Sequence, residues 1–142
     1  MRKTDIAYWA GFFDGEGCIG LDSNVRSIVL SVSIGQANPW LIQHLRFTFG
    51  GSVRRRPIGS CGNKRPFWVW RAHANQALSF LEIVYPFLKL KKQEAEIAIN
   101  FQRNRRGKGC RMSEEERTIE EAQQFLVRRL KDKSSTGGSN DI

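Results

Sequence analysis

Acidic residues are missing from the middle of this 142-residue chain, because no Asp or Glu occurs between residues 23 and 81. Arginine and lysine are frequent in the same stretch, and the whole chain carries a formal net charge of +9. Such a one-sided block of positive charge is typical of a surface that binds nucleic acid. From charge alone, a solvated basic surface or a ribosome-associated protein remains the alternative interpretation.

The sequence also lacks the features of a membrane protein and of a disulfide-rich secreted protein. No apolar run reaches the roughly 18 residues that a membrane span requires. Cysteine occurs only at Cys18, Cys61 and Cys110, without a Cys-x-x-Cys pair, which argues against a disulfide framework and a structural zinc site. The first ten residues contain Asp5 and aromatic side chains where a signal peptide would have an apolar stretch. We therefore expect an intracellular protein, cytoplasmic or organellar, with no membrane partner.

The composition fits one globular domain. Hydrophobic residues make up 40% of the chain and charged residues 26%, and the length is sufficient for a hydrophobic core. We predict a single domain over residues 1–133. The remaining stretch, 134–142, is polar and glycine-rich, and we expect it to be a disordered tail.

The pattern of apolar residues, prolines and glycines predicts a mixture of helices and strands. Helices are expected at 4–15, 38–49, 75–86 and 91–105, and from a capping box at Ser113 and Glu116 to about residue 131. Strands are expected at 18–21, 25–36, 52–56 and 65–73. The order is α-β-β-α-β-β-α with extra C-terminal helices over about 91–131, which is an α+β class. An apolar stripe should pack the last helix onto the third helix; it consists of Ile119, Ala122, Leu126 and Leu130.

The strands predict a sheet with one apolar face and one polar, basic face. In the strand at 25–36, apolar residues alternate with serines, so one face packs on a core. Two hairpins with helices on one side would form a curved antiparallel sheet, whose outer face suits a groove of duplex DNA. Trp68 and Trp70 are expected to belong to the core. The residues expected to face DNA are Asn24, Arg26, Ser31, Ser33, Arg54, Arg56, Lys64, Arg65 and Arg71.

The first helix carries a stripe of small or short side chains. These residues recur at spacings of three and four, so they share one helix face: Ala7, Ala10, Gly11, Asp14 and Gly15. Another helix could pack against such a face at close approach. We therefore predict that this stripe is a dimer interface.

Two acids, Asp14 and Glu16, stand at the C-terminal end of the same helix. The helix macrodipole disfavours each negative charge there by about 0.3–1 kcal/mol. A divalent cation would compensate, and Mg²⁺ binds one or two carboxylates together with phosphate oxygens and water. Hydrogen bonds to nearby backbone or to lysine would compensate equally well, so the residues alone leave both interpretations open.

Residues 9–17, Trp-Ala-Gly-Phe-Phe-Asp-Gly-Glu-Gly, resemble the nine-residue motif of the LAGLIDADG homing endonucleases. In that family the motif forms a helix that pairs with its counterpart and delivers acids to a metal site. Trp9 replaces the leading leucine and is a conservative departure. The positions that match the motif are Ala10, Gly11, Phe12, Phe13, Asp14, Glu16 and Gly17.

The resemblance covers about residues 5–105 and implies a LAGLIDADG-type fold with the order of elements given above. It also implies three catalytic residues. Glu16 would be the metal ligand, Gln36 the polar residue that orders active-site water, and Lys91 the active-site lysine near the scissile phosphate. A solvated lysine is the alternative interpretation of Lys91. Asp14 is expected to cap or brace the helix pair, and the family's further basic residue after Gln36 has no clear counterpart in this sequence.

The sequence contains one copy of the motif, whereas a double-strand break needs two such sites. The resemblance therefore implies a homodimer that acts on a long, partly palindromic duplex site. The implied activity is site-specific DNA cleavage with Mg²⁺ or another divalent cation such as Mn²⁺, leaving short 3′ overhangs, in intron homing. Two alternatives stay open: a cleavage-inactive relative that acts as an RNA splicing maturase or a DNA-binding regulator, and a basic structural protein of a ribonucleoprotein. The second would leave the paired acids and the small helix face unexplained.

Overall fold

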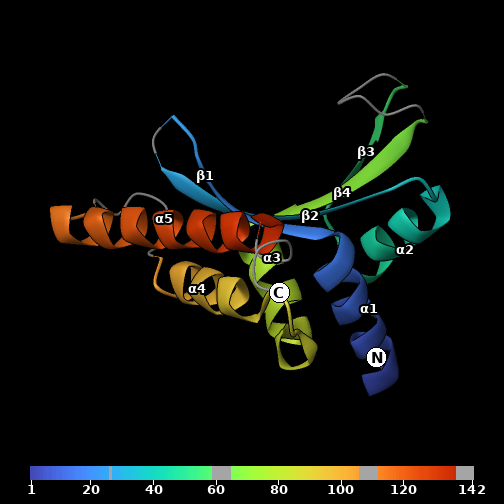
Figure 1. The fold of residues 1–142 in the computed structure, drawn as a ribbon, viewed down its shortest axis with the longest axis horizontal. Coiled ribbons are helices and arrows are strands. Elements are labelled where there is room, and N and C mark those ends of the chain that lie inside the picture. Colours follow the sequence, from blue (N-terminus) through green and yellow to red (C-terminus); the bar gives the residue numbers. More distant parts are fainter. Residues whose placement is uncertain (26, 59–64, 106–111, 137–142) are drawn as a thin grey trace.

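The computed structural model, which describes residues 1–25, 27–58, 65–105 and 112–136, shows a four-stranded antiparallel sheet with helices below it (Figure 1). The predicted α+β class and α-β-β-α-β-β-α order are confirmed. The elements in chain order are α1 (Lys3–Glu16), β1 (Gly17–Ser23), β2 (Ile28–Gln36), α2 (Pro39–Phe49), β3 (Ser52–Arg56), β4 (Phe67–His73), α3 (Ala74–Val84), the 3-10 helix η2 (Tyr85–Phe87), α4 (Lys92–Arg103) and α5 (Glu114–Thr136).

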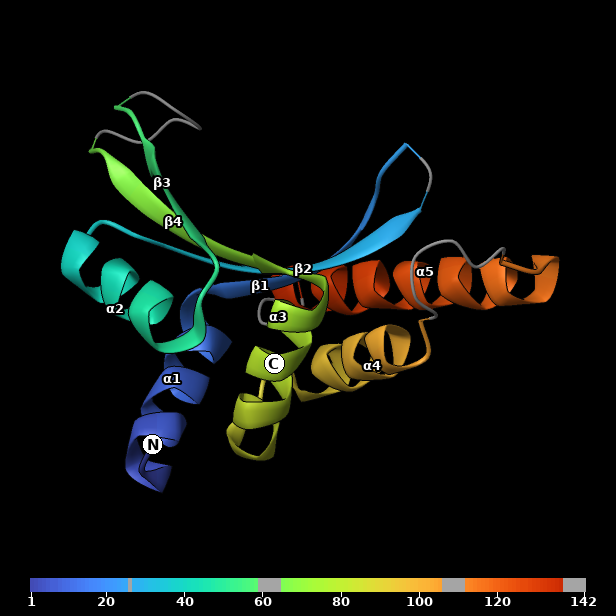
Figure 2. The same cartoon turned by 180° about the vertical axis from the view of Figure 1, so that it is seen from behind.

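The strand order is β1-β2-β4-β3, so β2 and β4 are the central strands of the sheet. They pair antiparallel, with Val32 opposite Ala72 and Ile34 opposite Trp70. The two views in Figures 1 and 2 show both hairpins curving away from the helices, so that the sheet is concave on its helix-free side. We call this side the outer face.

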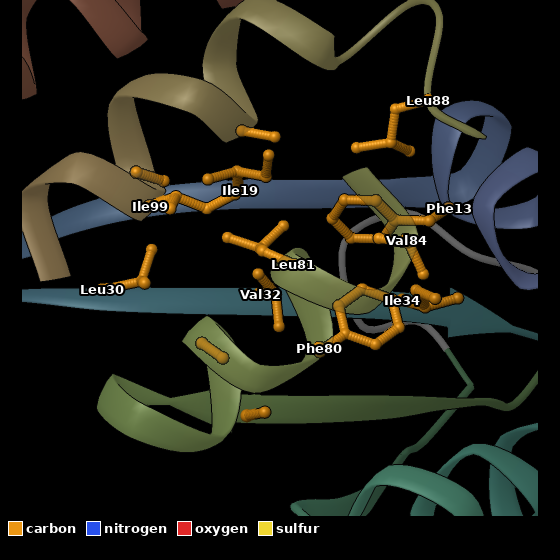
Figure 3. Packing of buried hydrophobic residues seen from close by; sticks show 14 of the residues in the cluster. Phe13, Ile19, Leu30, Val32, Ile34, Phe80, Leu81, Val84, Leu88 and Ile99 are labelled. Carbon is orange, nitrogen blue, oxygen red and sulfur yellow. The ribbon is translucent and has the colours of Figure 1, made fainter. Parts of the chain in front are cut away.

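The core fills the space between the sheet and the helices. Alternate residues of β2 are completely buried, as the sequence pattern predicts: Leu30, Val32 and Ile34. Figure 3 shows Phe13 of α1 beside Phe80 of α3, and their ring centroids lie 5.0 Å apart. Branched side chains of the sheet and aromatic rings of the helices therefore interlock in one apolar cluster.

Trp70 belongs to this core, as predicted. Its side chain is fully buried, and its indole Nε1 donates a hydrogen bond to the backbone oxygen of Gly50 at 2.7 Å. Trp68 lies on the same face but is only half-buried, and the guanidinium of Arg55 stands 6.0 Å from its ring centroid. The bond from Trp70 holds the end of α2 against β4.

Some element boundaries differ from the prediction. The motif helix runs from Lys3 to Glu16 rather than over 4–15, and the Asp5 carboxylate in its first turn accepts the Arg2 amide at 3.3 Å. The second strand begins at Ile28, three residues later than expected. The start of α2 is confirmed, because the Asn38 side chain accepts the amides of Trp40 and Leu41.

The capping box of the last helix is also confirmed. Ser113 Oγ accepts the Glu116 amide at 3.2 Å, and the Glu116 carboxylate accepts the Ser113 amide at 3.0 Å. The helix extends to Thr136, beyond the expected end at about residue 131. The rest of the expected tail, 137–142, lies outside the described residues.

The packing of α5 differs from the prediction in both its face and its neighbour. Ile119 and Leu126 are 59% and 49% exposed, whereas Gln124 and Val127 are buried. The helix packs on α4 and along β1 rather than on α3. The position of α5 is explained by β1, which is an edge strand of the sheet. The Gln124 amide of α5 donates a hydrogen bond to the Leu21 carbonyl of β1 at 2.8 Å. None of the described helices is long and apolar enough to cross a membrane.

Candidate active site

The C-terminal end of α1 meets the sheet and places Glu16 there as the last residue of the helix. The chain passes directly from the helix into β1 through Gly17. A Cβ atom on Gly17 would overlap the ring of Phe13, which is fully buried. The glycine that closes the motif is therefore required by close packing, and it sets the direction in which Glu16 leaves the helix.

Glu16 and Gln36 line the same open groove, which has a volume of about 520 Å³. The strand register explains their approach, because Gly17 pairs with Ile34 and the two residues stand just beyond that pair. Gln36 accepts the Ala37 amide through Oε1 at 2.7 Å, which fixes the orientation of its side chain. The groove is completed by Gly35, Ala37, Arg65, Pro66 and Phe67.

Arg65 is a member of this groove that the sequence assigned only to DNA binding. Its exposed side chain shares the groove with the carboxylate of Glu16 and the amide of Gln36. The basic residue that the family resemblance led us to expect after Gln36 thus has a candidate from another part of the chain. No pattern in the sequence indicated that Arg65 belongs to this groove, because Arg65 comes near Gln36 only when β4 pairs with β2.

Asp14 is bound within its own chain. Its carboxylate accepts the backbone amides of Lys89 at 2.8 Å, Leu90 at 3.2 Å and Lys91 at 3.0 Å. Successive amides that converge on one anion form a binding concavity for negative charge. Asp14 therefore braces α1 against the segment that leads into α4, and hydrogen bonding to backbone is the compensation that this acid receives.

Lys91 completes the same contact from the other side. Its Nζ donates a hydrogen bond to the backbone oxygen of Asp14 at 2.7 Å. This oxygen is one of the carbonyls at the C-terminal end of α1, where a positive charge is favourable. The structure thus places the Lys91 ammonium at the helix end that carries Glu16, although Lys91 does not line the groove itself. The alternative of a solvated lysine does not fit this half-buried, hydrogen-bonded side chain.

Glu94 is a second residue that the sequence interpretation missed. It lies in the first turn of α4, and its side chain is only 4% exposed. Burial raises the pKa of this carboxyl, while the neighbouring ammonium groups of Lys91 and Lys131 lower it. No local pattern marked it, because its burial depends on the packing of α4 against α3 and α5.

Several residues predicted to face DNA share the outer face of the sheet. The register pairs Ser33 with Arg71, and Arg71 with Ser52, across three neighbouring strands. The Ser31 hydroxyl donates a hydrogen bond to the Asp22 carboxylate at 2.9 Å. The predicted residues that alternate onto this face are Ser31, Ser33, Arg54, Arg56 and Arg71. Asn24 is exposed in the turn after β1, whereas Arg26 and Lys64 lie outside the described residues.

The small-residue stripe of α1 is narrower than the sequence indicated. Ala7, Gly11 and Gly15 are exposed, and a Cβ atom on either glycine would meet nothing within 4 Å. Ala10 is completely buried in the core of its own chain, so the structure does not bring its side chain to this face. Asp14 points to the segment before α4, as described above. The open part of the stripe therefore consists of three residues one helical turn apart.

Glu16 is the candidate metal ligand among the described residues. In the part of the chain that the structure describes, no group of three or more His, Cys, Asp or Glu side chains could hold a metal ion. Glu16 offers one exposed carboxylate at the edge of the groove. That donor fits a hard cation of the Mg²⁺ type, which takes its remaining oxygens from phosphate, water or a second carboxylate.

The sequence matches no protein-family model and no curated protein. Solved structures, in contrast, match over most of the chain. The homing endonuclease I-CvuI, in complex with its target in the presence of Ca, shares 19% identity and a TM-score of 0.69, covering 89% of this chain and 82% of that one. The archaeal intron-encoded homing endonuclease I-Vdi141I, complexed with DNA, shares 14% identity and a TM-score of 0.55, covering 92% and 99%.

A third similar structure is the LAGLIDADG homing endonuclease I-GzeII in complex with a DNA target. It shares 16% identity and a TM-score of 0.57, covering 87% of this chain but 43% of that one. At these identities the likeness establishes the fold. The chain therefore has the fold of the LAGLIDADG homing endonucleases, as the resemblance of residues 9–17 led us to expect.

Proposed function

We propose that this chain is a site-specific DNA endonuclease that requires a divalent cation and acts as a homodimer. The observation that carries the proposal is the exposed Glu16 carboxylate, which lines a groove with Gln36 and Arg65 next to a concave face rich in arginine. The fold supports it, because similar solved structures are homing endonucleases in complex with DNA. The expected products are double-strand breaks with short 3′ overhangs, made for intron homing.

Hydrolysis of a phosphodiester needs an activated water, neutralised phosphate charge and a stabilised leaving oxygen. A divalent cation bound at Glu16, Mg²⁺ or Mn²⁺, would supply Lewis acidity and activate water. Gln36 would position water in the groove, and Arg65 would hold a phosphate oxygen by charge-assisted hydrogen bonds. Lys91 would place positive charge at the end of α1, close to the developing negative charge of the reaction.

The homodimer follows from the small face of α1 and from the single Glu16. A glycine inside a helix costs about 1 kcal/mol relative to alanine, and among the described residues no atom lies within 4 Å of a Cβ added at Gly11. Close approach of a second helix gives this residue a purpose. The chain also covers 43% of the chain of I-GzeII and 47% of that of I-SmaMI, so it is similar to about half of these relatives.

The cleavage test is a selection on a library of duplex DNA with Mg²⁺, followed by sequencing of the broken ends. Glu16→Gln keeps the size of the side chain and removes the charge, and Glu96→Gln on the exposed side of α4 is the control. Discrete breaks with short 3′ overhangs, absent only with Glu16→Gln, would support the proposal. Binding to a discrete sequence without cleavage by the wild type would refute it in favour of a regulator or maturase, and RNA splicing would then be assayed.

The dimer is tested by sedimentation at micromolar concentration. Gly11→Glu places a charge on the open part of the α1 stripe, where an added Cβ atom would meet nothing within 4 Å, so the protomer should fold and become monomeric. Ala122→Glu, at an exposed position of α5, should leave the dimer intact. A Gly11→Glu variant that remains dimeric would refute pairing through α1.

A further inference from the structure

Asp22 is the one acidic residue in the four strands that the structure describes. Its side chain is exposed and belongs to the outer face, because Leu21 before it is buried on the opposite face and side chains alternate along β1. The proposed function brings the outer face against DNA, whose phosphates repel a carboxylate. An acid at this place therefore calls for an attractive contact that outweighs the repulsion.

The carboxylate of Asp22 is held on the outer face by a neighbouring strand. It accepts a hydrogen bond from the Ser31 hydroxyl of β2 at 2.9 Å. Gly20 pairs with Ser31, and a Cβ atom on this glycine would stand 2.8 Å from Asp22 Oδ2 and 3.0 Å from Ser31 Oγ. The glycine thus leaves the space in which the two side chains meet.

The backbone on both sides of Asp22 is held from the opposite face of the sheet. The buried side-chain amide of Gln124 on α5 donates hydrogen bonds to the Leu21 carbonyl at 2.8 Å and to the Ser23 hydroxyl at 3.0 Å. These two residues flank Asp22 in the chain. The carboxylate is therefore ordered before any ligand arrives, which reduces the entropic cost of binding through it.

The chemistry of the carboxylate selects among the four bases. An ionised carboxylate offers only hydrogen-bond acceptors, and among the described residues the second oxygen of Asp22, Oδ1, has no donor and no ion-pair partner. In the major groove cytosine presents only a donor, its N4 amino group. Guanine and thymine present acceptors, and adenine places the acceptor N7 beside its N6 amino group. Cytosine is therefore the base whose edge matches Asp22.

We infer that Asp22 is a specificity-determining residue that accepts a hydrogen bond from the N4 amino group of one cytosine in each half-site of the DNA. Ser31 and the space above Gly20 fix its carboxylate for this contact. The arginines of the outer face attract any sequence through its phosphates, whereas Asp22 selects a base. This inference rests on the proposed function, because it requires duplex DNA on the outer face.

The test selects randomised duplex DNA for binding and compares the enriched sequences of the wild type and Asp22→Asn. The wild type should favour cytosine about 5- to 100-fold over the other bases at one position of each half-site. Asparagine keeps the shape of the side chain and adds an amino donor, which makes it a bidentate partner for adenine. Asp22→Asn should therefore shift the preference at that position alone from cytosine to adenine. The control Glu96→Gln, on the exposed side of α4, should leave every position unchanged.

A second variant keeps the acid and moves it. The Cβ atom of Gly20→Ala would displace the Asp22 carboxylate and the Ser31 hydroxyl, which are the ends of short side chains and can move without unfolding the sheet. Thermal unfolding checks that the variant is folded. Gly20→Ala should weaken the preference for cytosine at the position that Asp22→Asn changes, and an unaltered preference would refute the part assigned to Gly20.

The outcomes separate this inference from the proposed function. Identical base preferences in the wild type and Asp22→Asn would overturn the inference, since a purely structural bond to Ser31 reads no base. A wild type that favours another base at the position changed by Asp22→Asn would overturn it as well. If the wild type binds a discrete sequence without cutting it, and Asp22 still selects cytosine there, the endonuclease proposal fails while the inference stands. A wild type that enriches no sequence would overturn both.

Discussion

Replacing Asp14 should destabilise the folded protomer itself. The carboxylate accepts three backbone amides from the segment before α4, and charge-assisted bonds contribute about 1.5–3 kcal/mol each when fully formed. Asp14 is half-buried and the amides of Lys89 and Leu90 can be solvated when released, which reduces this sum. Removing a negative charge from the C-terminal end of α1 returns about 0.3–1 kcal/mol. The stabilisation by the three hydrogen bonds is therefore larger than the unfavourable interaction of the carboxylate with the helix macrodipole.

We therefore expect Asp14→Ala to lower the free energy of unfolding by about 2–3 kcal/mol and Asp14→Asn by about half of that, since an amide oxygen can still accept. For a domain of this size the Tm should fall by about 3–4 °C per kcal/mol. Urea unfolding followed by circular dichroism, at two protein concentrations, separates protomer stability from dissociation. Asp5→Asn is the control, because its carboxylate is exposed and accepts one amide at 3.3 Å.

The refuting result is specific. If Asp14→Asn unfolds like the wild type and only the dependence on protein concentration changes, Asp14 acts between two chains. The assignment of Asp14 to a contact between α1 and the segment before α4 of the same chain would then be wrong. An equal loss of stability in Asp5→Asn would also contradict the assignment, because that residue lacks the three converging amides.

The remaining predictions concern α5, the buried acid and the outer face. Gln124→Ala should cost about 1–3 kcal/mol in urea unfolding, because it leaves the Leu21 carbonyl of β1 without the buried amide of α5; unchanged stability would mean that water replaces the amide. Burial raises the pKa of Glu94 above its ordinary 4.5, so the folded protein binds its proton more tightly than the unfolded chain and this residue lowers stability as pH rises above about 4.5. The stability of Glu94→Gln relative to wild type should therefore be greater at pH 7 than at pH 4, and a difference independent of pH would contradict the shift. Arg71→Ala should weaken binding to duplex DNA and reduce the slope of log K against log salt by about one, whereas Arg103→Ala, which pairs with Glu82 away from the sheet, should leave the slope unchanged.

Local patterns in the sequence predicted most of the elements correctly. The alternation in β2, the Asn38–Pro39 helix start and the Ser113 capping box all depend on residues close together in the chain, and all three are confirmed. Boundaries were less certain where no local signal stops an element. The helix α5 extends to Thr136, whereas the apolar pattern suggested an end at about residue 131.

Interactions between distant segments were predicted less well. The sequence predicted that Ile119 and Leu126 would be the inward face of α5, yet the helix turns Gln124 inward to satisfy the edge of β1, which is more than 100 residues away. Hydrophobic periodicity cannot anticipate this, because the unpaired carbonyl exists only once the sheet has formed. Ala10 is similar: its spacing put it on the small stripe of α1, whereas the structure buries it in the core of its own chain.

The sequence by itself determined the order of the elements, the basic outer face and the motif that ends in Glu16, because periodicity, caps, charge and residue type are local properties. Only the tertiary structure decided which side chains meet. It brought Gln36 and Arg65 to the groove of Glu16, bound Asp14 to the amides before α4, and turned the Gln124 amide of α5 to the Leu21 carbonyl of β1. Each of these contacts joins residues far apart in the chain, and the order of the strands and the packing of the helices determine them.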